Sequence, residues 1–175
     1  PLTRGQYRAL GKDADGDAPL PKAELHFKDA RDACADLDPP PLLPGEKPGA
    51  KPGLPTEAQW EYGARAGTAT RWSFGEDPAA LGDHAWFDGN AERDAYPVGE
   101  KVANGLCLAD LHGNLWEWVA DCFAEDAYGR RRGPLTLDPK EEAADCASRV
   151  VRGGSFFLPP AVLRSANRDD DRPDD

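Results

Sequence analysis

The sequence predicts an α+β domain with little regular secondary structure, and three observations lead to this prediction. The 175 residues include 18 glycines and 17 prolines, well above ordinary usage, and both residue types weaken the interiors of helices and strands. Five Trp, four Tyr and six Phe supply enough bulk for a packed core. The patterns that indicate helices and strands are short and widely separated. This length fits one domain, so we assign residues 1–175 to a single unit.

Two stretches of the N-terminal third lack a helical pattern. Residues 1–21 are expected to form an edge segment followed by an acidic, glycine-rich loop at 11–17. Residues 38–55 carry seven prolines and three glycines, a composition typical of linkers and extended surface loops. We therefore expect a proline-rich loop or insert at 38–55.

Two helices are indicated. The first is marked by apolar residues spaced along one helical face, Ala30, Ala33, Cys34 and Leu37. The second begins at Thr56, a favourable N-cap that forms a capping-box pattern with Gln59. It is expected to end at Gly67, which adopts the left-handed conformation readily.

Two short strands follow. Leu115–Val119 alternates in polarity, with Trp116 and Trp118 expected on one face. Arg149–Arg152 is expected to form a second strand, which a pair of glycines ends. The region between the helices and these strands is expected to be coil pinned by aromatic residues, Trp72, Phe74, Trp86 and Phe87.

The net charge of −11 and the pI near 4.7 limit the classes of partner. Nucleic acids and anionic membranes both require a basic face, so neither is an expected partner. No apolar run approaches the ~18 residues of a membrane-spanning helix, and no signal-peptide core is visible. The chain starts at Pro1 and contains no Met, so we expect its native beginning to be missing and leave the cellular compartment open.

The four cysteines are widely spaced and form no C-x-x-C motif. They predict either buried thiols or one structural disulfide, for which Cys122 and Cys146 are the nearest pair.

Four motifs occur in order along the chain: 54-LPTEAQWEY-62, 110-DLHGNLWEW-118, 149-RVVRGGS-155 and 164-RSANR-168. Together they resemble the formylglycine-generating-enzyme (sulfatase-modifying factor) domain. The resemblance implies a C-type lectin-like fold with sparse secondary structure around a small sheet. Members of that family continue beyond the position equivalent to Asp175. Together with the missing native beginning, this leads us to expect a chain that is truncated at both ends.

The residues of these motifs also have a structural interpretation. Gly113 and the Gly153–Gly154 pair allow a turn or a close backbone approach. Core anchors are expected from large indole side chains, namely Trp60, Trp116 and Trp118. Clamps between loops are expected from guanidinium groups, namely Arg65, Arg149, Arg152 and Arg164.

The resemblance implies a chemistry that this sequence lacks residues for. Enzymes of the family oxidise a substrate cysteine with oxygen, using two cysteines that bind copper in the stretch after the RGGS motif. Here that stretch, Phe156–Leu163, contains no cysteine, and none occurs after Cys146. We therefore predict a non-catalytic protein, with a formylglycine-generating oxidase as the alternative.

Residues 152–175 resemble more narrowly the variable region of variable proteins diversified by retroelements, which share the lectin-type fold. In those genes the adenines of template Asn codons are randomised between invariant frame residues. The frame is present here, although Phe156 replaces the usual Trp. Randomising the two adenines of AAC yields codons for Phe, Leu, Pro, Ala, Val and Asp, the residues found between the frame positions. The predicted ligand-binding residues are Phe156, Phe157, Leu158, Pro159, Ala161, Val162, Asp169, Asp170, Asp171 and Asp175.

The composition of this region independently favours a recognition surface. An apolar group lies next in sequence to an acidic cluster, and exposed apolar patches with charged rims are typical of binding sites. We expect the partner to be another protein. Two other interpretations stay open: Phe156 and Leu163 fill the core while the aspartates form a solvated tail, or the chain is a structural accessory domain that binds nothing.

The resemblance also implies a calcium site. Carried onto this sequence, Asp110 and Glu117 supply carboxylates while Gly113 and Leu115 supply backbone carbonyls, a set of hard oxygen ligands. The alternative is that Asp110 and Glu117 cap backbone donors or pair with arginines.

Overall fold

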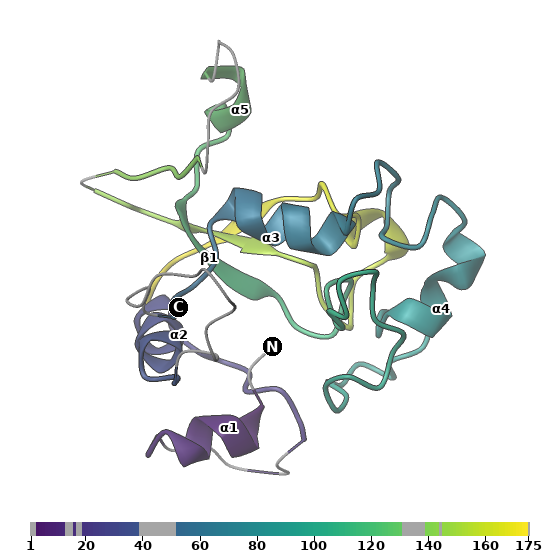
Figure 1. Cartoon of the computed structure of the whole chain (residues 1–175), viewed down its shortest axis with the longest axis horizontal. Coiled ribbons are helices and arrows are strands. Elements are labelled where there is room, and N and C mark those ends of the chain that lie inside the picture. The colour runs from purple at the N-terminus through teal and green to yellow at the C-terminus, as the bar shows by residue number, and fades with distance from the viewer. Residues whose placement is uncertain are drawn as a thin grey trace, which may run out of the picture.

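A three-stranded antiparallel sheet lies at the centre of the computed structural model (Figure 1). The structure describes residues 3–12, 16, 19–38, 52–130, 139–143 and 145–174. The strands are β1 (Glu117–Cys122), β2 (Arg149–Arg152) and β3 (Asp169–Asp171), in the order β1-β2-β3. In register, Glu117 pairs with Arg152 and Arg149 pairs with Asp171, so β2 is hydrogen-bonded on both sides.

Short helices surround this sheet. They are α1 (Arg4–Ala9), α2 (Phe27–Ala35), α3 (Glu57–Arg65), α4 (Leu81–His84) and α5 (Ala127–Arg130), with the 3₁₀ turns η1 (Pro78–Ala80) and η2 (Pro160–Val162). Of these, α3 packs against both β1 and β2, whereas α1 and α2 lie at the end of the molecule where the C-terminus also lies (Figure 1). None of the helices in these described ranges has the length and apolar character needed to cross a bilayer.

The predicted capping box at the start of α3 is confirmed. The Thr56 hydroxyl accepts a hydrogen bond from the Gln59 backbone N–H at 3.2 Å, and the Gln59 side chain accepts one from the Thr56 N–H at 3.0 Å. The helix ends one residue earlier than predicted, because Ala66 already adopts the left-handed conformation at φ +48°.

The predicted helix around Ala30 and Ala33 is α2, and both side chains are buried. The edge segment expected at residues 1–21 is only partly observed, since Thr3 forms an isolated bridge with Pro21 but the next residues form α1. Most of the proline-rich stretch predicted at 38–55 lies outside the described residues, as does part of the loop predicted at 11–17.

The prediction for β2 is confirmed, but β1 begins two residues later and ends three residues later than predicted. The expectation that Trp116 and Trp118 anchor the core is wrong, because both are only half-buried. The Trp118 indole N–H donates to the Leu25 carbonyl at 2.8 Å. Trp118 therefore holds the segment that precedes α2 against β1.

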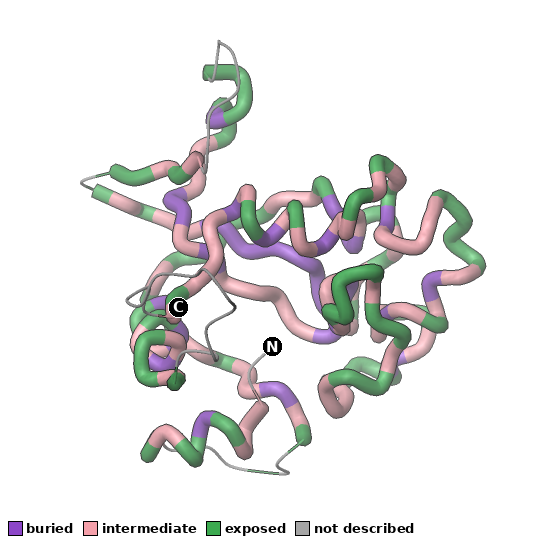
Figure 2. The backbone as a smooth tube through the Cα atoms, in the orientation of Figure 1, coloured by how far each residue is buried: buried purple, intermediate pink, exposed green. Residues whose placement is uncertain are grey.

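Buried side chains form two main clusters, one of which packs on the sheet, and Figure 2 shows the buried backbone following the sheet. The sheet cluster joins α3 to β1 and β2 through Trp60, Ala64, Val119 and Val150. The turn cluster joins α4 to the segment after β2 through Trp72, Leu81, Ala85 and Leu163. The segment after β2 is therefore part of the core on one side.

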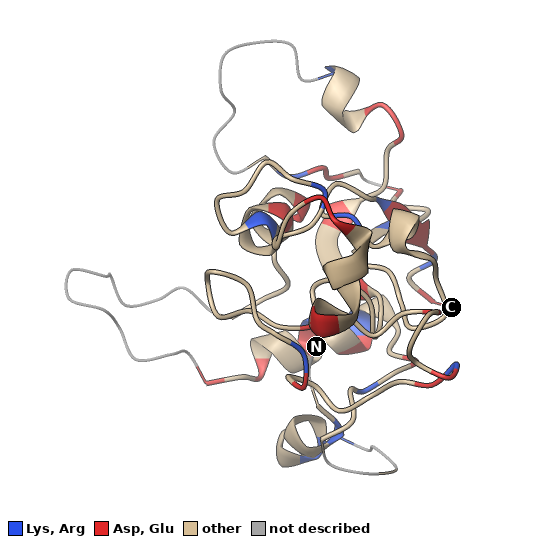
Figure 3. Cartoon of the chain, turned by 90° about the vertical axis from the view of Figure 1, so that its right-hand side faces the viewer, with Lys and Arg blue, Asp and Glu red and all other residues tan. Residues whose placement is uncertain are grey.

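A disulfide joins Cys122 at the end of β1 to Cys146, with 5.6 Å between the two Cα atoms. This is one of the two alternatives left open by the sequence. Cys34 and Cys107 are free thiols. Basic residues are spread among the acidic ones along the chain in Figure 3.

Candidate functional site

The segment at 156–162, called the display segment below, leaves β2 through a tight turn. Gly153 has φ +92°, and its carbonyl accepts a hydrogen bond from the Gly113 N–H at 2.9 Å. The Phe156 N–H then donates to the Asn114 carbonyl at 2.8 Å. The start of the display segment is thus held by the backbone of the loop that precedes β1.

Buried and exposed side chains alternate in and around the display segment. The flanking frame residues are buried, namely Arg152, Ser155, Leu163 and Ser165. Phe157 is 54% exposed, and Pro159 and Ala161 are exposed as well. Leu158 and Val162 are half-buried against the turn cluster. Of the six predicted apolar positions, three therefore face solvent and the others are partly covered.

Phe156 occupies an intermediate position between these two groups. Its ring is half-buried and meets the Phe157 ring edge-on, with 5.3 Å between the ring centroids. Phe156 therefore packs against the exposed Phe157 ring and supports it. Leu163, by contrast, is fully buried, as the core interpretation of that residue expects.

A hollow of about 550 Å³ lies between the display segment and residues 71–78. Its lining combines apolar surface with two guanidinium groups: Arg71, Trp72, Pro78, Pro160, Ala161 and Arg164. Arg164 is held by a hydrogen bond from its Nε to the Ala161 carbonyl at 2.7 Å, and Arg71 pairs with the exposed Glu76 at 3.1 Å. This surface can accept a ligand that carries both an apolar and an anionic group.

The predicted aspartates lie elsewhere. Asp169, Asp170 and Asp171 form β3, and all three are exposed. Asp171 lines a different cavity, between the sheet and the first two helices. The chain just after it is also held at α2, because the Pro173 carbonyl accepts a hydrogen bond from the Phe27 N–H at 3.1 Å. The structure therefore does not bring the aspartates into the hollow beside the display segment. Asp175 lies outside the described residues.

A network of charged side chains fixes the two ends of the frame to α3. Arg168 forms a bidentate pair with the buried Glu57, at 2.6 and 2.8 Å. Arg152 pairs with Glu61 at 2.5 Å and donates to the Ser165 carbonyl at 2.8 Å. Bidentate pairs of this kind fix geometry as well as charge. The network holds the chain on either side of the display segment in a defined position.

The environments of these two arginines differ. Burial lowers the pKa of Arg152, and attraction to Glu61 and Glu57 offsets this only in part. Burial also lowers the pKa of Arg168, but the hydrogen bond to Glu57 and the attraction to nearby acidic groups together outweigh it, so the net pKa is raised. Both groups keep their charge at neutral pH, so the network is ionic under ordinary conditions.

The predicted clamps contribute unequally. Arg152 joins distant segments, Arg149 donates to the Ala120 carbonyl at 2.9 Å, and Arg65 donates to the Thr70 carbonyl at 3.1 Å. The hydrogen bond of Arg164 to Ala161 is local in sequence. The pairing of Glu57 with Arg168 was not predicted. The only signal for it in the sequence is that each residue belongs to one of the four motifs.

The residues predicted to bind calcium make contacts within the protein. The Asp110 Oδ2 accepts a hydrogen bond from the Gly99 N–H at 2.7 Å, and Glu117 Oε2 accepts one from the Trp60 indole at 2.6 Å. Burial raises the pKa of Asp110, the Gly99 bond opposes this, and its Oδ1 is buried without a hydrogen-bond partner among the described residues. Across the described residues, no group of three or more His, Cys, Asp or Glu side chains is placed to hold a metal. Calcium binding through Asp110, Gly113, Leu115 and Glu117 stays a prediction.

The residues present do not fit a copper site of the kind implied for the enzymes. The display segment has no thiol, and Cys122 and Cys146 are joined to each other. Cys34 is half-buried on α2, and Cys107 is exposed in the loop held by Asn104. No pair of thiolates adjoins the display segment, so soft ligation of copper there lacks its ligands.

Comparisons with known proteins identify the family and the fold. The family model of the sulfatase-modifying factor enzyme 1-like domain matches residues 3–175. The formylglycine-generating enzyme of Thermomonospora curvata is 34% identical over 116 residues, covering 59% of this chain and 38% of that protein. The formylglycine-generating enzyme of Streptomyces coelicolor is 34% identical over 136 residues, covering 69% of this chain and 42% of that protein. The chain thus spans about two-fifths of the length of these curated relatives.

Solved structures resemble the whole chain. Treponema denticola variable protein 1 superposes with a TM-score of 0.75 and 21% identity, covering 99% of this chain and 77% of that one. PvdO from Pseudomonas aeruginosa gives a TM-score of 0.74 and 29% identity, covering 93% and 60%. The fold is therefore the C-type lectin-like fold of the formylglycine-generating type, mixed α+β with little regular secondary structure.

Proposed function

Because this chain belongs to the sulfatase-modifying factor enzyme 1-like domain family, we propose that it is a non-catalytic member that binds a protein ligand through the display segment. The ligand-binding positions vary between copies of the gene by retroelement-directed mutation. The observation that carries this proposal is the alternation of a buried frame with exposed intervening positions, from Arg152 to Ser165.

The burial pattern supports a surface whose residues can change. Substitution of an exposed side chain away from special features usually alters stability by less than about 0.5 kcal/mol. Phe157, Pro159 and Ala161 are exposed, whereas the neighbouring Ser155 and Leu163 are buried and in fixed contacts. New residues at the three exposed positions can alter recognition without altering the fold.

The chemistry of the surface supports a protein partner. The display segment carries an exposed Phe ring, and a hollow lined by two prolines, Arg71 and Arg164 adjoins it. Aromatic and arginine side chains are enriched at protein interfaces, and prolines reduce the entropy lost on binding. We expect a partner surface with an apolar side chain next to an acidic one.

The DNA around the gene tests the origin of this surface. We expect a reverse-transcriptase gene nearby and a near-copy of the last coding segment that differs from it at adenines. Sequencing many copies is expected to show variation concentrated in the codons of Phe157, Leu158, Pro159, Ala161 and Val162. Variation spread evenly over the frame residues would reject the proposal.

A second candidate function is a formylglycine-generating oxidase, which the sequence relatives of about one-third identity favour. It is tested by titrating the purified protein with copper(I) in competition with a chromophoric chelator. Stoichiometric uptake, together with oxidation of a cysteine in a peptide substrate, would replace the binding proposal with this one.

A further inference from the structure

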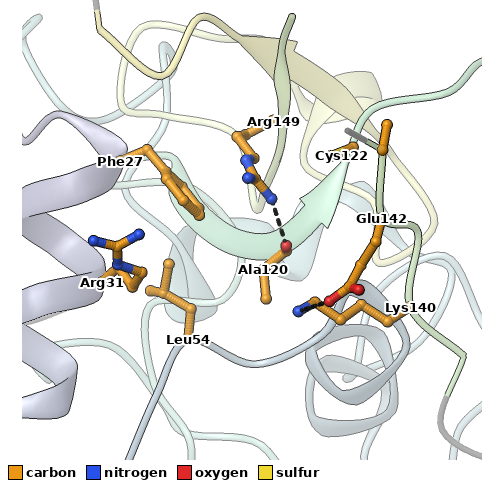
Figure 4. Close-up of a pocket in the computed structure, with 9 residues that line it drawn as sticks. Phe27, Arg31, Leu54, Ala120, Cys122, Lys140, Glu142 and Arg149 are labelled. Atoms are coloured by element: carbon orange, nitrogen blue, oxygen red, sulfur yellow. Dashed lines mark hydrogen bonds and ion pairs between the residues drawn. The ribbon is translucent and has the colours of Figure 1, made fainter. Parts of the chain in front are cut away.

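We propose that a third cavity, formed by α2, β1 and β2, binds the carboxylate of a small organic acid. Its volume is about 360 Å³, within the range of small-molecule sites. Figure 4 shows the side chains that line it, among them Phe27, Arg31, Leu54, Ala120, Lys140 and Arg149. No residue of the display segment lines it, so this proposal is independent of the proposed function.

Arg149 is the group that would bind the carboxylate, and its guanidinium is already held in place. It stacks on the Phe27 ring at 4.3 Å, and one terminal nitrogen donates to the Ala120 carbonyl at 2.9 Å (Figure 4). Its Nε is buried and has no hydrogen-bond partner among the described residues. A guanidinium that is already fixed in place is suited to carboxylate recognition, because little entropy is lost when the ligand binds.

Further cations surround Arg149 although the chain as a whole carries a net charge of −11. Arg31 lies one helical turn after Phe27 on α2, and Lys140 reaches in from the opposite wall, where it pairs with Glu142 at 2.6 Å (Figure 4). After burial, repulsion from Arg31 is the next cause that lowers the pKa of Arg149. A bound anion between these groups would relieve that repulsion.

Part of the remaining wall is apolar, and the Glu142 carboxylate, which pairs with Lys140, also lines the cavity. Leu54, Ala143 and the Phe27 ring line the cavity beside the guanidinium. Inorganic phosphate would gain nothing from these side chains, whereas the hydrocarbon part of an organic acid would bury apolar surface against them. The cavity therefore favours a carboxylate joined to a short hydrocarbon chain.

The test compares three probes on the ¹⁵N-labelled full chain by NMR titration at low ionic strength and pH 7. Hexanoate carries both features, hexan-1-ol lacks the charge, and inorganic phosphate lacks the hydrocarbon. We expect saturable shifts of residues at the cavity with hexanoate, and at least tenfold weaker binding of the other two. Equal binding of hexan-1-ol, equal binding of phosphate, or no saturable hexanoate binding would overturn the proposal.

Variants then locate the site. Arg31→Gln removes a half-exposed cation whose ion pair is local, to Asp32 at 2.8 Å, so the variant is expected to fold and to bind hexanoate at least threefold more weakly. Arg149→Lys keeps the charge but loses the fork, and we expect at least tenfold weaker binding. Arg93→Gln is the control for net charge, since Arg93 is exposed and does not line the cavity. Equal affinity of wild type and Arg31→Gln, or equal loss in Arg93→Gln, would contradict the assignment.

Discussion

Gly113 shows how a single backbone position supports the display segment. It has φ +99°, and a Cβ built on it would lie 2.1 Å from the Trp86 carbonyl oxygen. Its N–H donates to the Gly153 carbonyl at 2.9 Å, which fixes the turn after β2. The sequence predicted a close approach here from the residue type, but it did not identify the carbonyl that is approached.

We predict that Gly113→Ala lowers the free energy of unfolding by about 3 kcal/mol or more, because the new methyl group collides with backbone that cannot move aside cheaply. Gly129→Ala is the matched control, since a methyl group there would have no described heavy atom within 4 Å and the φ of Gly129 is not positive. Urea denaturation measures both. Similar losses in the two variants would mean that the contact with Trp86 has no energetic importance.

Other residues could not be placed from the sequence. Trp116 and Trp118 look like core anchors because of their size, yet both are half-buried. Asp121, which looks like a surface residue, is fully buried. Its two carboxylate oxygens accept hydrogen bonds from the Glu57 N–H at 2.7 Å and the Glu141 N–H at 2.8 Å. Those donors come from distant parts of the chain, so local pattern carries no signal for this burial.

At the scale of elements, the start of α3 was the most predictable feature. The α3 cap depends on Thr56 and Gln59, which are three residues apart and readable from the sequence alone. The same signal, Thr3 with Gln6, marks the start of α1 and could have identified that helix. The strands were less predictable, because buried Asp121 interrupts the apolar alternation within β1.

We predict that Thr56→Ala destabilises the protein by about 1 kcal/mol, since the Gln59 N–H loses its acceptor at the first turn of α3. Thr56→Ser keeps the hydroxyl and is expected to stay within a few tenths of a kcal/mol of wild type. Thermal unfolding followed by circular dichroism distinguishes the two. Equal melting temperatures for wild type and Thr56→Ala would show that α3 is held by packing alone.

At the scale of the whole molecule, the four motifs were sufficient to predict the fold and the family. They were not sufficient to place the candidate site, because the predicted residues are adjacent in sequence but divide between two regions of the structure. The display segment turns back over the turn cluster, whereas Asp169 to Asp171 continue along the sheet towards α2. The contacts of Arg152 and Arg168 with α3 fix the point at which the chain reverses. Each contact joins residues that are about a hundred positions apart in the sequence.

His112 links the stability of the whole fold to pH. One ring nitrogen contacts the Leu163 carbonyl at 2.8 Å and the other accepts from the Ser73 N–H at 3.2 Å, an arrangement that suits the neutral ring. Burial lowers the pKa of His112 to about 4, against a partly offsetting hydrogen bond to Leu163. The unfolded chain therefore binds more protons between about pH 6.5 and 4, and stability falls as the pH decreases through that window.

We predict a loss on the order of 3 kcal/mol from this group between pH 7 and pH 4. His112→Gln is expected to have a flatter profile of unfolding free energy over the same range. Burial also raises the pKa of Asp110, which acts in the opposite direction, so the difference between variants isolates His112. Parallel profiles for wild type and His112→Gln would contradict the assignment.

The strand β3 has a consequence for how any partner can approach. It is an outer strand of the sheet seen in the described residues, and three consecutive aspartates occupy it with all side chains exposed. A foreign strand that tried to extend the sheet there would bring its backbone alongside a row of like charges, which natural proteins use to block edge-to-edge aggregation. Self-association by strand addition is thereby disfavoured at this edge.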